Sequence, residues 1–213
     1  MEAPGQERAD VVPNIANPKR RYDNSEQGRR DEVALATSNV IARVGLEGTS
    51  MREISQEMGV STGVLTYHFR NKEELLDFVF DNMVELLEER RHFDIFETVE
   101  AFRDALLASM PSTEELRRWW KVWLAFTTGA YSRPAQRMRQ IDLSNRVNAT
   151  WRASLERLRG LGLLRPDIDI DHETATLGYL FDGMGLNGVY YPDLPAAEHH
   201  KAVIDAFFSR IRA

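Results

Sequence analysis

The sequence predicts an all-α fold, and two observations support this. From Arg29 onward, apolar side chains recur every three or four positions, the spacing that places them on one face of a helix. No segment alternates apolar and polar residues as a half-buried strand would. With 213 residues and 43% hydrophobic composition, the chain can form one large domain or two small ones. We expect a disordered arm over residues 1–28, short helices over residues 29–76 and longer helices over residues 77–213.

The composition limits the possible functions. The formal net charge of −6 argues against a protein that coats nucleic acid without specificity, although it allows a basic patch on one face. There is no cysteine, which excludes disulfides and thiolate metal sites and fits a cytoplasmic location. No stretch approaches the roughly 18 apolar residues of a membrane span, and the start of the chain lacks the apolar core of a signal peptide, so no membrane partner is expected.

The arm contains three prolines, several charges and little apolar periodicity, which is typical of disorder. Its basic cluster, Lys19 to Arg21, can touch phosphates, but a solvated tail is the favoured interpretation.

Two helices are predicted in the first part of the 29–76 region. The first ends at Gly45 and Gly48. The second starts after Ser50, which stands three residues before Glu53 as in a capping box, and ends at Gly59. The apolar stripe of the first helix consists of Val33, Ala36, Val40, Ile41 and Val44.

A third helix, from Thr62 to about Phe69, is barely two turns long. Leu65 and Phe69 lie four residues apart and supply its buried stripe. Asn71 is expected to cap a fourth, long amphipathic helix. The side chains of the third helix that point elsewhere are mostly polar: Thr62, Gly63, Thr66, Tyr67 and His68.

Two short helices joined by a tight glycine-containing turn, packed on a preceding helix, form a helix-turn-helix. Its second helix enters the major groove of DNA. Ser61 and Thr62 offer hydroxyls at a helix N-terminus to a phosphate, and Gly63 allows close approach of the backbone. Lys72 gains nothing from the start of its own helix, so a phosphate is its expected partner. The alternative is a small helical bundle whose polar face is merely solvated.

The segment "GLEGTSMREISQEMGVSTGVLTYHFRNKEELL" resembles the DNA-binding domain of the TetR family of bacterial transcriptional regulators. The resemblance implies a DNA-binding domain over residues 29–76, a third helix that reads an operator, and a homodimer. It places Thr49 or Ser50, together with Arg52, at phosphate-facing positions, and Lys72 at a backbone clamp. One departure is Thr66, where the family often has Tyr. The DNA-binding residues expected on both grounds are Ser50, Arg52, Ser61, Thr62, Gly63, Thr66, Tyr67, His68 and Lys72.

The C-terminal part resembles the ligand-binding domain of regulators typified by the betaine-operon repressor. The likeness is carried by "AFRDALLASMPSTEELRRWWKVWLAF", "LRPDIDI" and "LFDGMGLNGVYYPDL". It implies a ligand-binding and dimerisation domain over residues 77–213. Helices are predicted over about 97–110, from a Thr113 cap, from Pro134 to Gly160, over about 172–190 and over about 195–211.

Three tryptophans within five residues exceed what a small bundle needs, although an aromatic stripe more often forms core. Polar Asn145 and Asn148 interrupt the stripe of the next helix, and a ligand is one possible partner for them. Tryptophan faces suit an organic cation and equally a flat hydrophobic molecule. The expected pocket is lined by Met83, Leu87, Trp119, Trp120, Trp123, Phe126, Asn145, Asn148, Phe181 and Met184.

The last two helices are apolar on more than one side, which predicts burial on both sides. We expect a two-fold four-helix interface between two copies, and hence a near-palindromic DNA operator. The residues concerned are Leu180, Phe181, Met184, Leu186 and Val189, then Val203, Ile204, Phe207, Phe208 and Ile211.

Two other motifs fail on context. "GMGLNG" satisfies the dinucleotide fingerprint but sits inside a predicted helix with no strand before it, so its glycines are expected to allow close helix packing, including packing across a dimer axis. "DIDID" imitates the start of a calcium loop without its glycine and glutamate. No cofactor or metal is expected.

Three functions remain. The favoured one is a DNA-binding repressor released from its operator by a small-molecule ligand. The second is a DNA-binding dimer of the same fold without an inducer. The third is an all-helical enzyme, for which no catalytic residues stand out.

Overall fold

The structure, a computed structural model, describes residues 26–89, 94–130, 133–191 and 196–213. These residues form nine helices and no β-strand, apart from one isolated antiparallel bridge between Leu164 and Arg212. The all-α prediction is therefore confirmed. The helices are α1 (Glu26–Gly48), α2 (Met51–Met58), α3 (Thr62–His68), α4 (Lys72–Glu89), α5 (Val99–Ala108), α6 (Glu114–Gly129), α7 (Pro134–Gly160), α8 (Ile170–Tyr190) and α9 (Ala196–Ile211).

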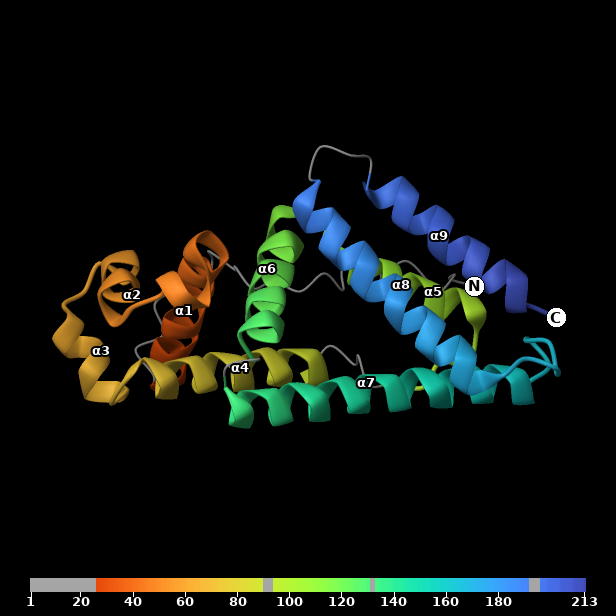
Figure 1. Cartoon of the computed structure of the whole chain (residues 1–213), viewed down its shortest axis with the longest axis horizontal. Coiled ribbons are helices and arrows are strands. Elements are labelled where there is room, and N and C mark those ends of the chain that lie inside the picture. Colours follow the sequence, from red (N-terminus) through yellow and green to blue (C-terminus); the bar gives the residue numbers. More distant parts are fainter. Residues whose placement is uncertain (1–25, 90–93, 131–132, 192–195) are drawn as a thin grey trace, which may run out of the picture.

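The helices form an elongated molecule (Figure 1). α1, α2 and α3 lie at one end, and α5, α8 and α9 lie at the other. α6 stands between the two groups and packs against α1 on one side and α8 on the other. None of the helices in the described part of the chain is long and apolar enough to cross a bilayer.

Helix starts are capped where the sequence predicted. The hydroxyl of Ser50 accepts from the amide of Glu53 at 3.1 Å, and Thr113 accepts from the third amide of α6 at 3.2 Å. Asn71 does the same for α4 at 2.9 Å. Each cap satisfies one of the amides that a helix start leaves without an intrahelical partner. The carboxylate of Glu53 lies 3.8 Å from the Arg43 guanidinium of α1.

Some boundaries differ from expectation. α1 begins at Glu26, so the last three residues assigned to the arm are helical, whereas Lys19 to Arg21 lie outside the described residues. Gly45 does not end α1 but kinks it, with φ 73° and ψ 174°, and one further turn follows. α8 begins two residues earlier than predicted because Asp169 caps it, accepting from the amides of Asp171 and His172.

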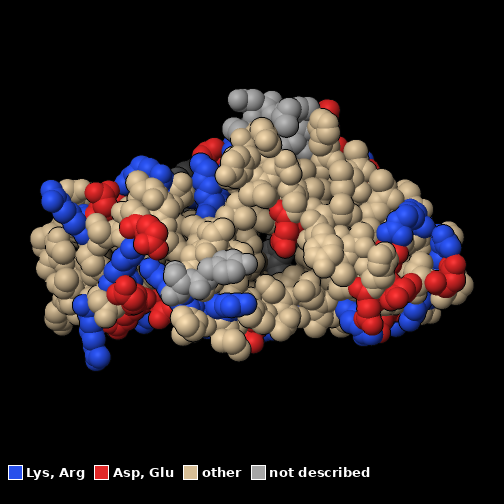
Figure 2. Space-filling view, viewed as in Figure 1, with Lys and Arg blue, Asp and Glu red and all other residues tan. Residues whose placement is uncertain are grey.

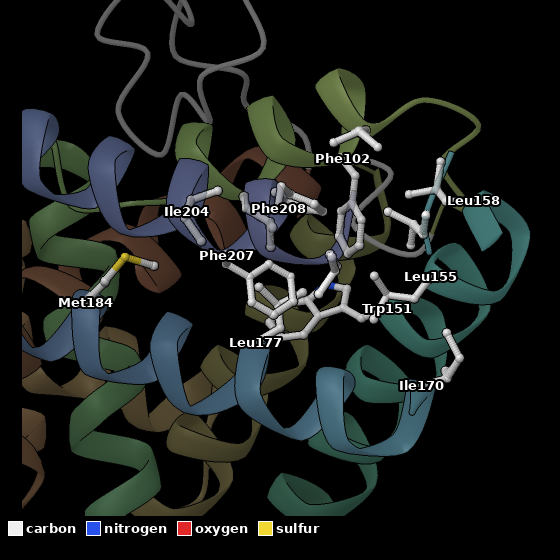
Figure 3. Packing of buried hydrophobic residues seen from close by; sticks show 14 of the residues in the cluster. Phe102, Trp151, Leu155, Leu158, Ile170, Leu177, Met184, Ile204, Phe207 and Phe208 are labelled. Atoms are coloured by element: carbon white, nitrogen blue, oxygen red, sulfur yellow. The ribbon is translucent and has the colours of Figure 1, made fainter. Parts of the chain in front are cut away.

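The buried apolar residues form three clusters. The smallest lies among α1, α2, α3 and the start of α4, and includes Ile54, Leu65 and Phe69. A second joins α1 and α4 to α6, and a third fills the space among α5 to α9. Figure 3 shows part of this third cluster, in which Phe102 of α5 meets Phe208 of α9 with ring centroids 5.6 Å apart.

α6 contributes to two of these clusters at once. Its Val122 and Phe126 are buried against α1 and α4, whereas Trp120 is buried in the C-terminal cluster. Trp119 and Trp123 are only half-buried and pack against both. α6 therefore ties the N-terminal helices to the C-terminal ones.

The glycines of "GMGLNG" allow close packing, but within one chain. A Cβ at Gly185 would stand 2.1 Å from the Trp120 ring, and one at Gly188 would stand 2.3 Å from Pro111. Gly183 has open space around it. The suggestion that these glycines meet across a dimer axis therefore does not apply to Gly185 and Gly188.

The outer faces of α8 and α9 also need a correction. Ile204, Phe207, Phe208 and Ile211 are buried in the C-terminal cluster, since α9 packs on α5. They are not free to form an interface between subunits. The apolar and aromatic side chains that do face outward from these two helices are Tyr179, Leu186, Tyr190 and Val203.

Replacing Gly185 by alanine is expected to destabilise the protein by about 1–3 kcal/mol, because the new methyl group would collide with the rigid Trp120 ring. Gly183→Ala is the matched control, since it adds the same methyl group to α8 in open space and should be neutral or stabilising. Urea unfolding at one protein concentration measures both. Equal stability of the two variants would contradict the packing described.

Candidate functional site

The turn between α2 and α3 fixes the angle between these helices. Gly59 adopts the left-handed conformation, with φ 68° and ψ 27°, which favours glycine. Its amide and that of Val60 donate to the last carbonyls of α2, which ends the helix. The Ser55 hydroxyl donates to the Arg52 carbonyl at 2.9 Å and lies 3.2 Å from the Thr62 hydroxyl, which therefore donates to it. The first turn of α3 is thus fastened to α2.

α3 is anchored by one stripe and open elsewhere. Leu65 is fully buried and Phe69, just after the helix, is 7% exposed. Tyr67 is 85% exposed, and its ring lies edge-on to the adjacent His68 at 5.0 Å. The other predicted DNA-facing residues of this segment, Ser61, Thr62, Gly63, Thr66 and His68, are also exposed. Two buried side chains therefore hold a short helix whose remaining surface faces solvent.

Gly63 is not required by packing inside the chain. A Cβ at this position would meet only the Ser61 hydroxyl, at 3.7 Å, which is ordinary van der Waals contact. Its φ lies outside the left-handed region. A glycine also lowers the stability of a helix. Neither packing within the described chain nor the backbone conformation therefore requires a glycine at this position.

The predicted DNA-contacting residues around α2 differ in whether their side chains are available for an external partner. Arg52 is exposed. Ser50 accepts the cap hydrogen bond described above, so its hydroxyl proton is the part left to donate. Thr49, which the family resemblance offers as an alternative to Ser50, is 2% exposed and donates to the Gly45 carbonyl at 2.7 Å. Thr49 therefore serves the α1–α2 corner and does not face outward.

Lys72 has a local partner, contrary to the sequence argument. Its ammonium donates to the carbonyl of Leu46 at 2.6 Å. The kink at Gly45 lies next to that carbonyl, and Lys72 joins it to the start of α4. An ammonium carries three donors, so Lys72 keeps capacity for a second partner.

The α1–α2 contact is held by a polar cluster that the sequence did not reveal. Arg43 donates to Glu57 at 2.9 Å, and Asn39 donates to the other oxygen of the same carboxylate at 3.1 Å. The hydrogen bond from Arg43 lowers the pKa of the Glu57 carboxyl. Lys and Arg side chains project from the end of the molecule occupied by α2 and α3 (Figure 2).

A groove of about 760 Å³ lies between the start of α1, the end of α3 and α4. Arg29, Arg30, Tyr67 and His68 contribute to its lining, together with acidic residues of α4. Arg30 stacks over the Phe78 ring at 4.8 Å. This groove was not anticipated from the sequence, since its walls come from three separate segments.

A second candidate site surrounds the tryptophans of α6. Trp119 and Trp123 stack in parallel, with centroids 5.9 Å apart and planes 6° apart. The indole N–H of Trp119 is buried and has no hydrogen-bond partner among the described residues. Trp120 differs, because it is buried and donates to the Ser109 carbonyl at 2.8 Å.

The structure does not bring the expected pocket residues together as one lining. Met83, Leu87 and Phe126 belong to the core between α1, α4 and α6, and Trp120 and Met184 belong to the C-terminal core. Phe181 is half-buried and contacts the rings of Trp120 and Trp151. The residues at the boundary of the two cores are Trp119 and Trp123.

The expectation for Asn145 and Asn148 is wrong. Both side chains are exposed on α7 and need no buried partner. The polar residue that does reach α6 is Gln140, which is 7% exposed and donates to Thr127 at 3.0 Å. Thr127 in turn donates to the Trp123 carbonyl at 2.9 Å. Spacing alone did not show this link, because a buried glutamine resembles a solvated one in sequence.

A short helix with one buried stripe, an otherwise exposed polar surface and a fixed angle to a preceding short helix defines a helix-turn-helix DNA-binding protein. The model for bacterial regulatory proteins of the tetR family matches residues 35–79. The model for the C-terminal part of BetI-type transcriptional repressors matches residues 98–213. The chain belongs to the TetR family of bacterial transcriptional regulators, and its C-terminal part is of the BetI type.

Relatives agree with this assignment. The chain is 33% identical to the HTH-type transcriptional regulator PksA of Bacillus subtilis over 180 residues, covering 83% of this chain and 86% of PksA. It is 28% identical to BetI of Vibrio vulnificus, covering 85% and 91% of the two chains. The fold matches a transcriptional regulator from Saccharomonospora viridis solved in complex with choline, with a TM-score of 0.79 at 23% identity over 88% of this chain and all of that one. The relatives named here are transcriptional regulators.

Proposed function

We propose that the protein is a homodimeric repressor that binds a near-palindromic operator through α3 and leaves it when a small organic molecule binds beside Trp119 and Trp123. The observation that carries the ligand part is the half-buried, stacked tryptophan pair at the boundary of the two cores. Operator binding places the protein in the cytoplasm, with the bacterial chromosome.

On DNA, we assign base edges to Thr66 and phosphates to Tyr67, Ser61 and Arg52. Thr66 and Tyr67 are exposed on α3, and the Ser61 hydroxyl is exposed and makes no cap hydrogen bond. The Thr62 hydroxyl donates to Ser55, and the Thr66 hydroxyl donates to the Gly63 carbonyl at 3.2 Å, so each keeps only its capacity to accept a hydrogen bond from a base. His68 and Ser50 are further phosphate donors, and Lys72 would use its remaining donors.

Three features support a small-molecule site in the C-terminal part. Trp119 and Trp123 are half-buried and keep part of their indole surface outside the cores, whereas Trp120 is fully packed. The unpaired indole N–H of Trp119 needs an acceptor, and a buried donor without one is costly. The Saccharomonospora viridis regulator of the same fold holds choline, and tryptophan faces bind quaternary ammonium groups.

α6 offers a route from this site to the DNA-binding helices. Its last residue, Gly129, packs so closely on Leu46 of α1 that a Cβ there would stand 2.6 Å from the leucine methyl. A ligand that shifts α6 therefore displaces α1 and, with it, α3. A hundredfold loss of operator affinity requires about 2.7 kcal/mol of difference in ligand affinity between the two states.

The second candidate function is a DNA-binding dimer that no small molecule regulates. Five of the expected pocket residues are buried in the hydrophobic cores, which favours this candidate: Met83, Leu87, Trp120, Phe126 and Met184. The two candidates differ in whether any ligand releases the operator.

Gly63→Ala is expected to weaken operator binding by at least about tenfold, 1.4 kcal/mol, because the added methyl group would meet DNA and not protein. The same change should stabilise the folded protein by about 0.5–1 kcal/mol. Fluorescence anisotropy measures affinity for an operator selected from random DNA by the wild-type protein. Gly160→Ala, also in open space but on α7, is the control. Unchanged operator affinity in Gly63→Ala would remove α3 from the DNA interface.

Leu186→Glu combined with Val203→Glu is expected to give monomers, because both side chains face outward from α8 and α9 and a buried, unpaired charge at an interface is costly. Light scattering at micromolar concentration gives the mass. Val44→Glu, an exposed apolar position on α1, serves as the control. A double variant that remains dimeric would show that another surface joins the subunits.

Trp123→Leu is expected to abolish release of the operator by ligand, because leucine keeps apolar packing but removes the indole face. The test titrates choline and a panel of quaternary-ammonium and flat hydrophobic compounds against the protein–operator complex. Leu161→Met, at an exposed apolar position just after α7 and outside the DNA-binding helices, is the control for ligand response. If no compound releases the operator from the wild-type protein, the second candidate is the better description.

A further inference from the structure

The middle of α8 carries one acidic residue, Asp182. It stands one helical turn after Gly178 and one turn before Gly185, so the three lie along one flank of the helix. Gly185 on this flank faces Trp120 of α6, and a Cβ at Gly178 would lie 3.7 Å from the Asn148 amide oxygen of α7. Asp182 therefore lies on the side of α8 that is turned toward α6 and α7.

In the part of the chain that the structure describes, the Asp182 carboxylate makes no hydrogen bond and no ion pair. The side chain is reached by solvent, yet surrounding protein atoms raise the pKa of its carboxyl. Asp182 is therefore partly surrounded by protein, as a residue at the edge of a recess is. The other acidic residues of α8 are engaged, with Asp171 bonded to Arg152 and Glu173 to Arg210.

The recess is visible on the surface. Figure 2 shows a hollow near the middle of this face, with acidic atoms at its edge. The same view in Figure 1 places the hollow between α6 and α8, above α7. These are the helices that the flank of Asp182 faces, and α6 carries Trp119 and Trp123.

We propose that Asp182 is the specificity-determining residue of the effector site, and that it selects a ligand with a positively charged organic group over an uncharged ligand of the same shape. The inference rests on the proposed function, since it concerns the same ligand. Asp182 was not among the site residues predicted from the sequence, because a charged residue on the flank of a helix is normally interpreted as solvent-exposed.

The chemistry of the recess matches this ligand class. A cation beside Asp182 gains an opposite charge where water is partly excluded, so the attraction is stronger than at an open surface. The tryptophan faces attract the same cation through their negative ring faces. An uncharged isostere would leave the carboxylate without a partner, and an anion would be repelled by it. The unpaired Trp119 N–H adds a preference for a ligand that also carries a hydrogen-bond acceptor such as a hydroxyl.

The test uses matched pairs of probes that differ only in a quaternary nitrogen or carbon. Choline is paired with 3,3-dimethylbutan-1-ol, and benzyltrimethylammonium with neopentylbenzene. Affinity for the full-length protein is measured by isothermal titration calorimetry. The wild-type protein is expected to bind each cation at least about tenfold more tightly than its neutral isostere, a difference of about 1.4 kcal/mol.

Asp182→Asn keeps the shape of the side chain and removes its charge. It is expected to lower the affinity for both cations about tenfold and to change the affinity for the neutral isosteres by no more than about twofold. The preference for the cation over its isostere is then lost. Asp142→Asn, at an exposed position on the neighbouring α7, is the matched control and should keep both the preference and operator binding. If Asp182 had only a structural role, the substitution would weaken the binding of cations and neutral isosteres equally.

The outcomes separate the two proposals. If the neutral compounds bind as tightly as the cations and release the operator, the ligand site stands and the role of Asp182 is refuted. A cation preference that survives in Asp182→Asn also refutes that role. If none of the four probes binds the wild-type protein, both the cation selectivity and the effector site beside the tryptophans are contradicted.

Discussion

The packing of α6 between two hydrophobic cores is the constraint on which the rest of the molecule depends. Val122 and Phe126 belong to one core and Trp120 to the other, so α6 cannot move in one without disturbing the second. Close-packed interiors resist gradual deformation and favour a small number of discrete arrangements. A regulator needs such a helix, since it must exist in two states that differ at a distance from the ligand.

The DNA-binding end follows a different principle. There, two anchors, Leu65 and Phe69, fix a short helix whose other residues are left to solvent. The overall charge of −6 does not exclude DNA binding at this end, because basic groups are exposed where the helix-turn-helix lies and some acidic groups are paired with arginines. Among the paired acids, Glu57 is held by Arg43 and Asp171 by Arg152.

Local chemistry made much of the fold predictable. The caps at Ser50, Asn71 and Thr113 lie where the sequence placed them, because a cap depends on residues only three positions apart. The exposed face of α3 was equally readable from its two-residue apolar stripe. The orientation of the 27-residue α7 could not be predicted in the same way. α7 contacts α6 near the start of α7 and α8 farther along, and these neighbours determine which side of α7 faces inward. Asn145 and Asn148 were misplaced for that reason, and Asp182 and Gln140 were missed.

The kink at Gly45 brings three segments to one leucine. Leu46 lies in the core, its methyl groups meet the end of α6 at Gly129, and its carbonyl accepts from Lys72 at the start of α4. This junction shares no residue with Trp119, Trp123 or Asp182. Substitutions in the proposed effector site around α6 and α8 can therefore accumulate while the junction stays the same. Such an arrangement lets a lineage of regulators acquire new chemical signals without having to reinvent the switch itself.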